Sequence, residues 1–238
     1  MATIADNLQA VRERIARACA VAGRDPSGVT LLAVSKTFGP QAVAEAAAVG
    51  QRAFGENYVH EGVDKIAALR QAGWEGLQWH CIGPLQSNKT RLVAEHFDWV
   101  QSLDRLKIAQ RLNEQRPAQL PPLQVCLQVN IDGAPTKAGV APQQLVPLAQ
   151  AVVALPRLRL RGIMCIPDPQ PDAAAMRAVF AQAARLFDTL RAALGHPPEL
   201  DTLSMGMSDD LEHAIAAGST MVRVGSAIFG RRVYAGRG

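Results

Sequence analysis

Hydrophobic residues recur along the chain in a repeating order of short apolar runs and longer stretches with helical spacing. The first apolar run, at 29–34, is short and contains β-branched residues, as is typical of a strand buried on both faces. Similar short runs predict further strands at 52–55, 78–82, 98–101, 123–129, 159–165, 202–205 and 220–224. Between them, helical patterns lie at 59–72, 104–116, 145–155, 173–194 and 209–217.

An additional helix is predicted before the first strand. Thr3 and Asp6 have the spacing of a shortened capping box, and apolar side chains follow at helical intervals. The chain therefore opens with a helix, at 3–22, that precedes the repeating units. After the first strand, Pro40 begins an alanine-rich helical stretch that ends at Gly50, in keeping with the preference for proline at the start and glycine at the end of helices.

The order of these elements predicts the fold. Strict alternation of strands and helices needs a parallel sheet that helices cover. Eight such units in 238 residues fit a closed barrel better than an open doubly wound sheet, and no GxGxxG follows the first strand. Proline-rich patches at 117–122, 167–171 and 196–198 have the composition of surface loops. We therefore expect one α/β domain, residues 1–238, forming a (β/α)8 barrel of the TIM type.

Composition and charge narrow the class of protein. With 48% hydrophobic and 19% charged residues, the chain has too much apolar content for a disordered protein. The formal charge is +4, from 25 Lys and Arg against 21 Asp and Glu. These cations form no run with interleaved aromatic residues, so we expect no nucleic-acid partner.

The cysteines and the N-terminus give expectations about compartment and metal. The four cysteines are far apart and form no CxxC, which argues against a zinc site or a disulfide framework and favours a reducing compartment. The N-terminal segment carries charges where a signal peptide needs an apolar core, and no stretch approaches the roughly 18 apolar residues of a membrane span. We expect a cytoplasmic monomer without a metal site.

Candidate chemistry gathers where the predicted strands end, because a parallel barrel builds its active site from the C-terminal ends of its strands. Lys36 follows the wholly apolar first strand. One interpretation is that Lys36 is only the first solvated residue after a buried strand. The other is an amine nucleophile, since apolar walls lower the pKa of a lysine and make the free amine available for imine formation.

A phosphate site is predicted after the last two strands. Gly225 and Ser226 end the eighth strand and open a short apolar stretch able to form one helical turn, whose free N–H groups suit a phosphate. Ser208, expected at the N-cap of the helix after the seventh strand, supplies a neighbouring hydroxyl. A plain turn and a plain cap are the alternatives for these residues. Asp209 and Asp210 would repel a phosphate unless they point away.

Arg223 shares a strand face with Gly225 and should therefore point into the barrel mouth. An ion pair with a barrel carboxylate such as Glu56 is the alternative role for this arginine. An amine, a phosphate cradle and an arginine together describe a site for pyridoxal 5'-phosphate (PLP). Because arginine donates to the pyridine nitrogen and gives it no proton, the ring would be a poor electron sink, which disfavours aminotransferase chemistry.

At these residues the sequence resembles the YggS/PROSC family of pyridoxal phosphate homeostasis proteins. The resemblance covers nearly the whole chain, and it rests on LLAVSKTFG, RAFGENYVHE, WHCIGPLQSNK, VNIDGAPTKAGV, RGIMCIP and LSMGMSDDLEHAIAAGSTMVRVGSAIFG. It implies a fold like the N-terminal barrel of alanine racemase, PLP held as an aldimine on Lys36, and a role in buffering the cofactor or delivering it to apoenzymes. The residues that the family would bring to PLP are Lys36, Asn57, His80, Met207, Ser208, Arg223, Gly225 and Ser226.

The expected roles of three of these residues differ. Asn57 would lie beside the ring and Met207 close to the phosphate, whereas His80 is equally interpretable as a core histidine. The fifth loop departs from the family pattern, since Ala134 and Pro135 stand where an acidic residue is expected shortly before Lys137. We interpret Lys137 as a solvated loop lysine in preference to a second anion or aldehyde contact.

Three functions remain open at the level of sequence. The first is a PLP carrier without robust turnover and with no catalytic residue. The second is a PLP-dependent amino-acid racemase, which needs an acid or base on each face of the substrate carbanion. Lys36 supplies one, and Tyr58 and Tyr234 are the only tyrosines available for the other, because the β-domain that carries this group in alanine racemase is missing from the sequence. The third is a barrel enzyme that forms an imine between Lys36 and a phosphorylated metabolite.

Overall fold

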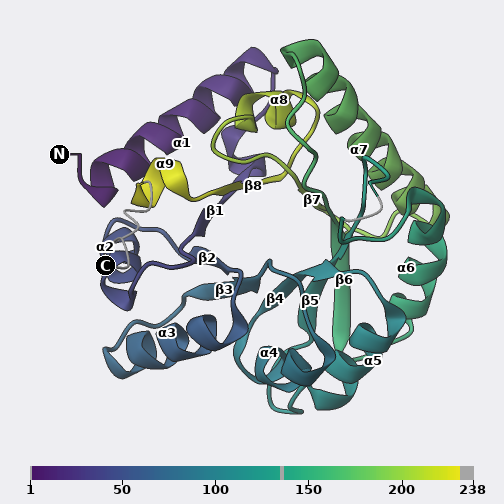
Figure 1. The fold of residues 1–238 in the computed structure, drawn as a ribbon, viewed down its shortest axis with the longest axis horizontal. Helices are drawn as coiled ribbons and strands as arrows, with labels where there is room; N and C mark the ends of the chain where they lie inside the picture. Colours follow the sequence, from purple (N-terminus) through teal and green to yellow (C-terminus); the bar gives the residue numbers. More distant parts are fainter. Residues whose placement is uncertain (1, 135–136, 231–238) are drawn as a thin grey trace, which may run out of the picture.

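The computed structural model describes residues 2–134 and 137–230. Eight parallel strands follow one another around a closed barrel, with each strand paired to the next and the last paired to the first (Figure 1). The strands are β1 Thr30–Val34, β2 Ala53–Glu56, β3 Gln78–Cys81, β4 Trp99–Leu103, β5 Leu123–Gln128, β6 Leu158–Met164, β7 Thr202–Ser204 and β8 Met221–Val224. The predicted barrel is therefore confirmed.

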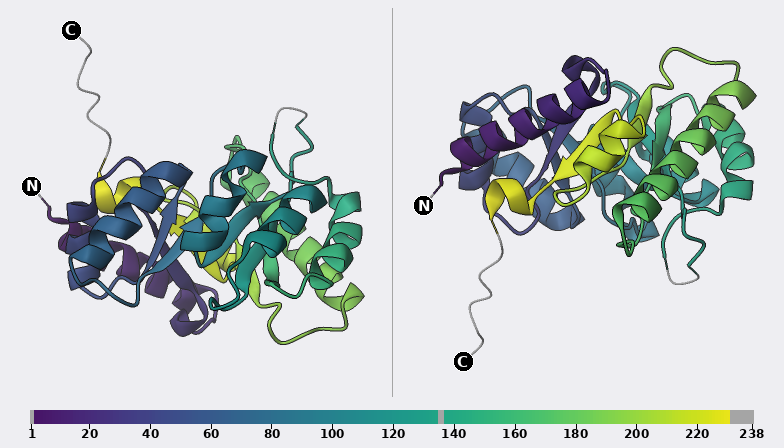
Figure 2. Two further views of the ribbon diagram at one scale, coloured as in Figure 1. Left: turned by 90° about the horizontal axis from the view of Figure 1, so that it is seen from below. Right: turned by 90° about the horizontal axis from the view of Figure 1, so that it is seen from above.

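Helices surround this sheet, and Figure 2 shows them from two further directions. They are α1 Ile4–Val21, α2 Pro40–Ala48, α3 Val59–Gln71, α4 Thr90–His96, α5 Leu106–Gln115, α6 Leu145–Val153, α7 Ala173–Ala193, α8 Leu211–Ala216 and α9 Ser226–Phe229. Short 3-10 turns lie at Pro26–Gly28, Ser87–Lys89 and Pro142–Gln144. The core fills the space between the sheet and these helices, as the burial of Phe54, Phe97 and Phe180 illustrates.

The extra N-terminal helix forms as the sequence predicts. Thr3 Oγ1 accepts from the backbone of Asp6, and the Asp6 carboxylate accepts from the backbone of Thr3, so the capping box is complete. The buried face of α1 packs beside the last elements of the chain, α8 and α9. One polar contact there is from Asn7 Nδ2 to the carbonyl of Ile228, at 2.9 Å. Helix α1 therefore packs the start of the described chain against its end.

Two details differ from the prediction. Helix α4 was not predicted, because it is only seven residues long and buries only Thr90, Val93 and Ala94, which is too short a pattern to show a helical period. The helix after β7 also starts later than expected. Its N-cap is Asp210 and not Ser208, since Asp210 Oδ1 accepts from the backbone of Met207 at 2.6 Å and closes a separate turn before the helix.

Candidate functional site

The predicted site residues meet at the C-terminal mouth of the barrel. A cleft with a volume of about 360 Å³ opens there, and Val34, Ile82 and Ile166 form its apolar walls. Seven of the eight residues predicted to bind a cofactor line it: Lys36, Asn57, Met207, Ser208, Arg223, Gly225 and Ser226. These residues belong to four strands or the loops after them, from Lys36 at the start of the chain to Ser226 near its end.

Lys36 lies at one side of this cleft, two residues beyond the end of β1, and it is half-buried. Asn57 occupies the corresponding place after β2. The backbone of Asn57 is closely packed against Gly83, because a Cβ atom added at residue 83 would lie 2.2 Å from the Asn57 carbonyl oxygen. Only glycine can stand at position 83 without moving Asn57.

Two hydroxyls and the start of α9 also line the cleft. Ser226 Oγ donates to Ser208 Oγ at 3.2 Å, so the loops after β7 and β8 meet at their side chains. Gly225 is the N-cap of α9, where the first N–H groups have no carbonyl acceptor within the helix. The arrangement offers hydroxyl and backbone donors to one anionic group.

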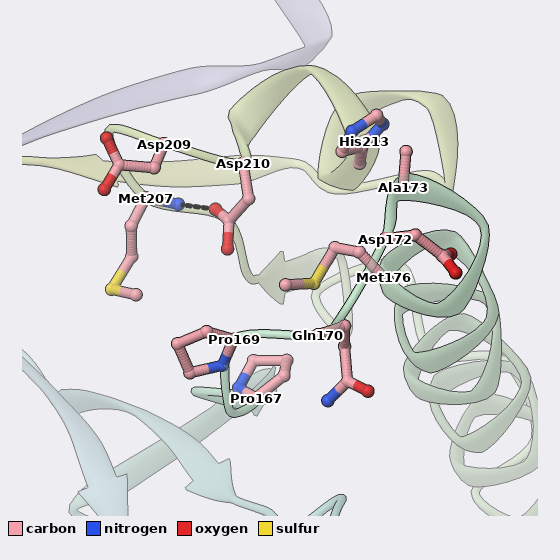
Figure 3. A pocket seen from close by; sticks show the side chains of 10 residues that line it. All are labelled: Pro167, Pro169, Gln170, Asp172, Ala173, Met176, Met207, Asp209, Asp210 and His213. Carbon is pink, nitrogen blue, oxygen red and sulfur yellow. Dashed lines mark hydrogen bonds between the residues drawn. The ribbon is translucent and has the colours of Figure 1, made fainter.

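The two aspartates that follow Ser208 have different surroundings. Figure 3 shows the Asp210 carboxylate bonded to the backbone nitrogen of Met207, which engages one of its oxygens in the turn. Asp209 lines the cleft, and together with Met207 it also lines a second cavity of about 380 Å³ beside the start of α7. The negative charge of Asp209 therefore partly offsets the positive charges of Lys36 and Arg223, which line the same cleft.

Arg223 points into the mouth and is only 4% exposed. Its Nη1 donates to Ser204 Oγ at 2.8 Å and its Nη2 to the carbonyl of Cys165 at 2.9 Å. Burial lowers the pKa of Arg223, although a guanidinium remains a donor with no acceptor capacity. Arg223 does not form the alternative ion pair with Glu56, whose carboxylate bonds to Lys65 at 2.7 Å.

A chain of buried hydrogen bonds leads from Arg223 into the barrel. Because Arg223 can only donate, the Ser204 hydroxyl must use its proton for the next bond, to Gln101 Oε1 at 2.6 Å. The Gln101 amide nitrogen then donates to His80 Nδ1 at 3.0 Å. His80 Nδ1 is therefore an acceptor, which assigns the proton of the neutral ring to Nε2.

His80 is the predicted site residue that does not line the cleft. It is 1% exposed and stacks on Trp99 with ring centroids 4.9 Å apart. Burial lowers its pKa to about 3, and Nε2 has no hydrogen-bond partner among the described residues. The geometry favours a neutral core histidine, connected to the mouth only through Gln101 and Ser204.

Comparisons with known proteins show the family to which this chain belongs. Residues 6–233 match the family described as alanine racemase, N-terminal domain. The chain is 57% identical to the pyridoxal phosphate homeostasis protein of Escherichia coli K12, over 98% of this chain and 99% of that one. It is 58% identical to the protein of the same name from Pseudomonas aeruginosa, over 98% of each chain. This chain belongs to the family of pyridoxal phosphate homeostasis proteins.

Solved structures of similar proteins share the barrel. PipY of Synechococcus elongatus, solved with PLP bound, matches with a TM-score of 0.81 and 38% identity, over 96% of this chain and all of PipY. Alanine racemase from Corynebacterium glutamicum matches with a TM-score of 0.64 and 19% identity, which shows the fold alone. The comparison covers 94% of this chain and 61% of that racemase.

The remaining candidates in this family member lie outside the cleft or outside the described residues. Lys137 is half-buried and forms ion pairs with Asp132, five residues before it, at 2.6 Å and with Asp168 at 2.8 Å, so its interpretation as a solvated loop lysine is wrong. Pro135, Thr136 and Tyr234 lie outside the described residues. Tyr58 is 56% exposed at the start of α3 and does not line the cleft.

Arg14, which no motif in the sequence marks, supports the site from the first helix. Arg14 of α1 donates to both carboxylate oxygens of Glu212 and, through Nη2, to the carbonyl of Ser208 at 3.0 Å. The first helix thus holds the turn that carries the Ser208 hydroxyl. No sequence signal reveals this role, because an arginine on the polar side of an amphipathic helix is usually solvated.

Within 2–134 and 137–230, the structure contains no group of His, Cys, Asp and Glu side chains arranged to hold a metal ion. Burial raises the pKa of the Cys81, Cys126 and Cys165 thiols to about 12, so these cysteines are protonated. No described helix is long and apolar enough to cross a membrane.

Proposed function

We propose that this protein binds PLP in the cleft at the barrel mouth, and that it buffers the cofactor or delivers it to apoenzymes without robust catalytic turnover of its own. One observation carries the proposal. An amine, a buried arginine and two bonded hydroxyls, which come from β1, β7 and β8 and the loops after them, line one cleft of about 360 Å³. The names of the relatives at 57% and 58% identity and the PLP-bound structure of PipY support the same conclusion.

Three sets of groups in the cleft fit parts of PLP. When bound, PLP supplies an aldehyde that condenses reversibly with an amine, and Lys36 is the amine in the cleft. Ser208, Ser226 and the N–H groups at the start of α9 would hold the phosphate. Arg223 would face the pyridine nitrogen as a donor, and the bonds to Ser204 and Cys165 keep its guanidinium in place.

The racemase alternative finds less support in the described residues. It needs an acid or base opposite Lys36, and Tyr58 lies 56% exposed outside the cleft. The third possibility, an enzyme that forms an imine with a phosphorylated metabolite, would use the same lysine and phosphate donors without PLP. Uptake of PLP separates it from the other two.

The first experiment tests PLP binding and its attachment point. Purified protein incubated with PLP should turn yellow, and borohydride should fix a pyridoxyl group on Lys36, located by peptide mass spectrometry. Lys36→Ala should lose the visible band while it keeps its unfolding midpoint. Lys107→Ala removes an exposed lysine outside the cleft and should retain the band. Wild-type protein that stays colourless in PLP would refute both PLP functions.

The second experiment separates a carrier from a racemase. PLP-loaded protein should exchange the Cα hydrogen of alanine and serine in D₂O far more slowly than ordinary enzyme turnover, on the order of one per second or more. It should also activate a PLP-dependent apoenzyme in the presence of a trap for free PLP. Exchange at enzymatic rates would make the racemase the better description.

The proposal includes a setting for this activity. Apoenzymes that need PLP are the partners, the cytoplasm is the compartment, and a monomer of one barrel domain is the working unit. No membrane or nucleic acid takes part. Sedimentation of the PLP-loaded protein over a range of concentrations tests the monomer, and a concentration-dependent mass would contradict it.

A further inference from the structure

The backbone directly after Lys36 has an unfavourable conformation. Thr37 has a φ of 68°, in the left-handed region that β-branched residues rarely adopt. Among the described residues other than glycine, only Thr37 and His196 have a positive φ. Such a conformation persists only where surrounding contacts enforce it. The turn that carries Lys36 must therefore be held from outside.

A buried cluster of charges lies against this turn. Lys65 of α3 is 2% exposed, and its Nζ lies 2.7 Å from Glu56 Oε1 and 3.0 Å from Glu61 Oε1. Glu56 is the last residue of β2, and Glu61 lies one helical turn before Lys65 on α3. The cluster therefore brings the end of one strand and the following helix together beside β1.

All three members of the cluster bond to the residues on either side of Lys36. Lys65 Nζ donates to the carbonyl of Ser35 at 2.9 Å, and Ser35 Oγ donates to Glu56 Oε1 at 2.6 Å. On the other side of Lys36, the backbone N–H of Thr37 donates to Glu61 Oε1. Both neighbours of Lys36 in the chain are thus fixed to one charged cluster.

Stability alone does not explain a cluster at this depth. A buried ion pair gains little over apolar residues of the same size, because both charges lose their hydration. Burial raises the pKa of Glu56, and its second oxygen, Oε2, has no hydrogen-bond partner among the described residues. What the cluster provides is directional contacts, and it directs them at the Lys36 turn.

We infer that Glu56, Glu61 and Lys65 are positioning residues for Lys36: they hold the turn from Ser35 to Thr37 in the strained form that presents the lysine to the cleft. Without them the turn relaxes, and only a fraction of the molecules present Lys36 correctly. The apparent affinity for PLP falls by that fraction. This inference rests on the proposed function of Lys36 as the PLP-binding amine.

Glu61 is the member best suited to a test, because its side chain is 29% exposed and its removal leaves the buried pair of Lys65 and Glu56 in place. Glu61→Ala should bind PLP about tenfold more weakly, measured by titration of the visible band. Asp64→Ala removes the same charge from an exposed position on the same helix and should bind PLP like the wild type.

Rescue then distinguishes positioning from a general structural role. Asparagine adopts the left-handed region more readily than threonine, so Thr37→Asn should favour the turn without help from Glu61. The double variant Glu61→Ala, Thr37→Asn should recover most of the lost affinity. Glu61→Gln keeps an oxygen for the Thr37 N–H and should lose less affinity than Glu61→Ala.

The outcomes separate this inference from the proposed function. If wild-type protein binds PLP on Lys36 while Glu61→Ala binds it equally well, the positioning role is overturned and the PLP function stands. A loss that Thr37→Asn does not restore also overturns it. If wild-type protein takes up no PLP, the proposed function itself fails. Unfolding midpoints recorded for every variant confirm that each comparison is between folded proteins.

Discussion

Replacement of His80 tests the hydrogen-bond chain that runs from the mouth into the barrel. The ring accepts from Gln101 through Nδ1, stacks on Trp99 and is 1% exposed, so the folded protein holds it neutral. Phenylalanine keeps the stacked ring but has no nitrogen to titrate. His80→Phe should therefore remove one pH-dependent contribution to the free energy of unfolding while it leaves the cleft intact.

The size of this contribution follows from the pKa of His80, which burial lowers from 6.5 to about 3. Between these values the unfolded chain binds a proton at this position and the folded protein does not. Stability from His80 is therefore complete above pH 6.5 and falls as the pH drops toward 3, by about 1.4 kcal/mol per pH unit. From pH 8 to pH 5 the loss amounts to about 2 kcal/mol.

Urea denaturation of cofactor-free wild type and His80→Phe at pH 8 and pH 5 measures this contribution. Other titrating groups are shared by the two proteins and cancel in the comparison. The variant is expected to be less stable at pH 8, because the Gln101 amide loses its acceptor, but to lose about 2 kcal/mol less than the wild type at pH 5. Parallel pH dependence in the two proteins would refute the neutral buried ring. A large loss of PLP affinity in His80→Phe would instead indicate a cofactor contact.

Further predictions concern the supports of the cleft. Arg14→Met should weaken PLP binding about three- to tenfold, because the turn at Ser208 loses the hydrogen bond from Arg14. Arg17→Met, on the same helix, removes only a 3.8 Å ion pair and should leave PLP binding unchanged. Equal effects of the two variants in a titration would contradict a supporting role for Arg14. Ser208→Ala should cost about 1 to 3 kcal/mol of PLP binding if its hydroxyl bonds the phosphate, and unchanged retention on dialysis would assign it to the turn alone. Gly83→Ala should displace Asn57 and lower both stability and PLP affinity, since the new Cβ would lie 2.2 Å from a carbonyl oxygen; wild-type behaviour in both assays would show that the loop yields freely.

Much of the site was predictable because the barrel imposes a simple rule. Once the alternation of strands and helices predicts a closed parallel barrel, every residue just after a strand is placed at one mouth. That rule led to Lys36 and Ser226, alternation along the eighth strand led to Arg223, and all three line the cleft. His80 was harder to interpret because a residue within a barrel strand can reach either the mouth or the interior.

The supporting contacts were not predictable in the same way. Arg14 and Ser208 are 194 positions apart, and Lys65 and Ser35 are 30 apart, with other elements between them. Arginine and lysine on helices usually face solvent, and nothing in the local pattern marks these two as exceptions. Helix α4 was missed for a related reason, since seven residues complete only about two turns.

The sequence by itself determined the periodic elements and therefore the barrel, because the spacing of apolar residues along the chain is a local property. It also determined which chemical groups stand at the strand ends. Only the tertiary structure decided how these groups are held: Arg223 by Ser204 and Cys165, and the left-handed turn at Thr37 by Glu61. Directional bonds between distant residues depend on the packed backbone, and for that reason no local pattern contains them.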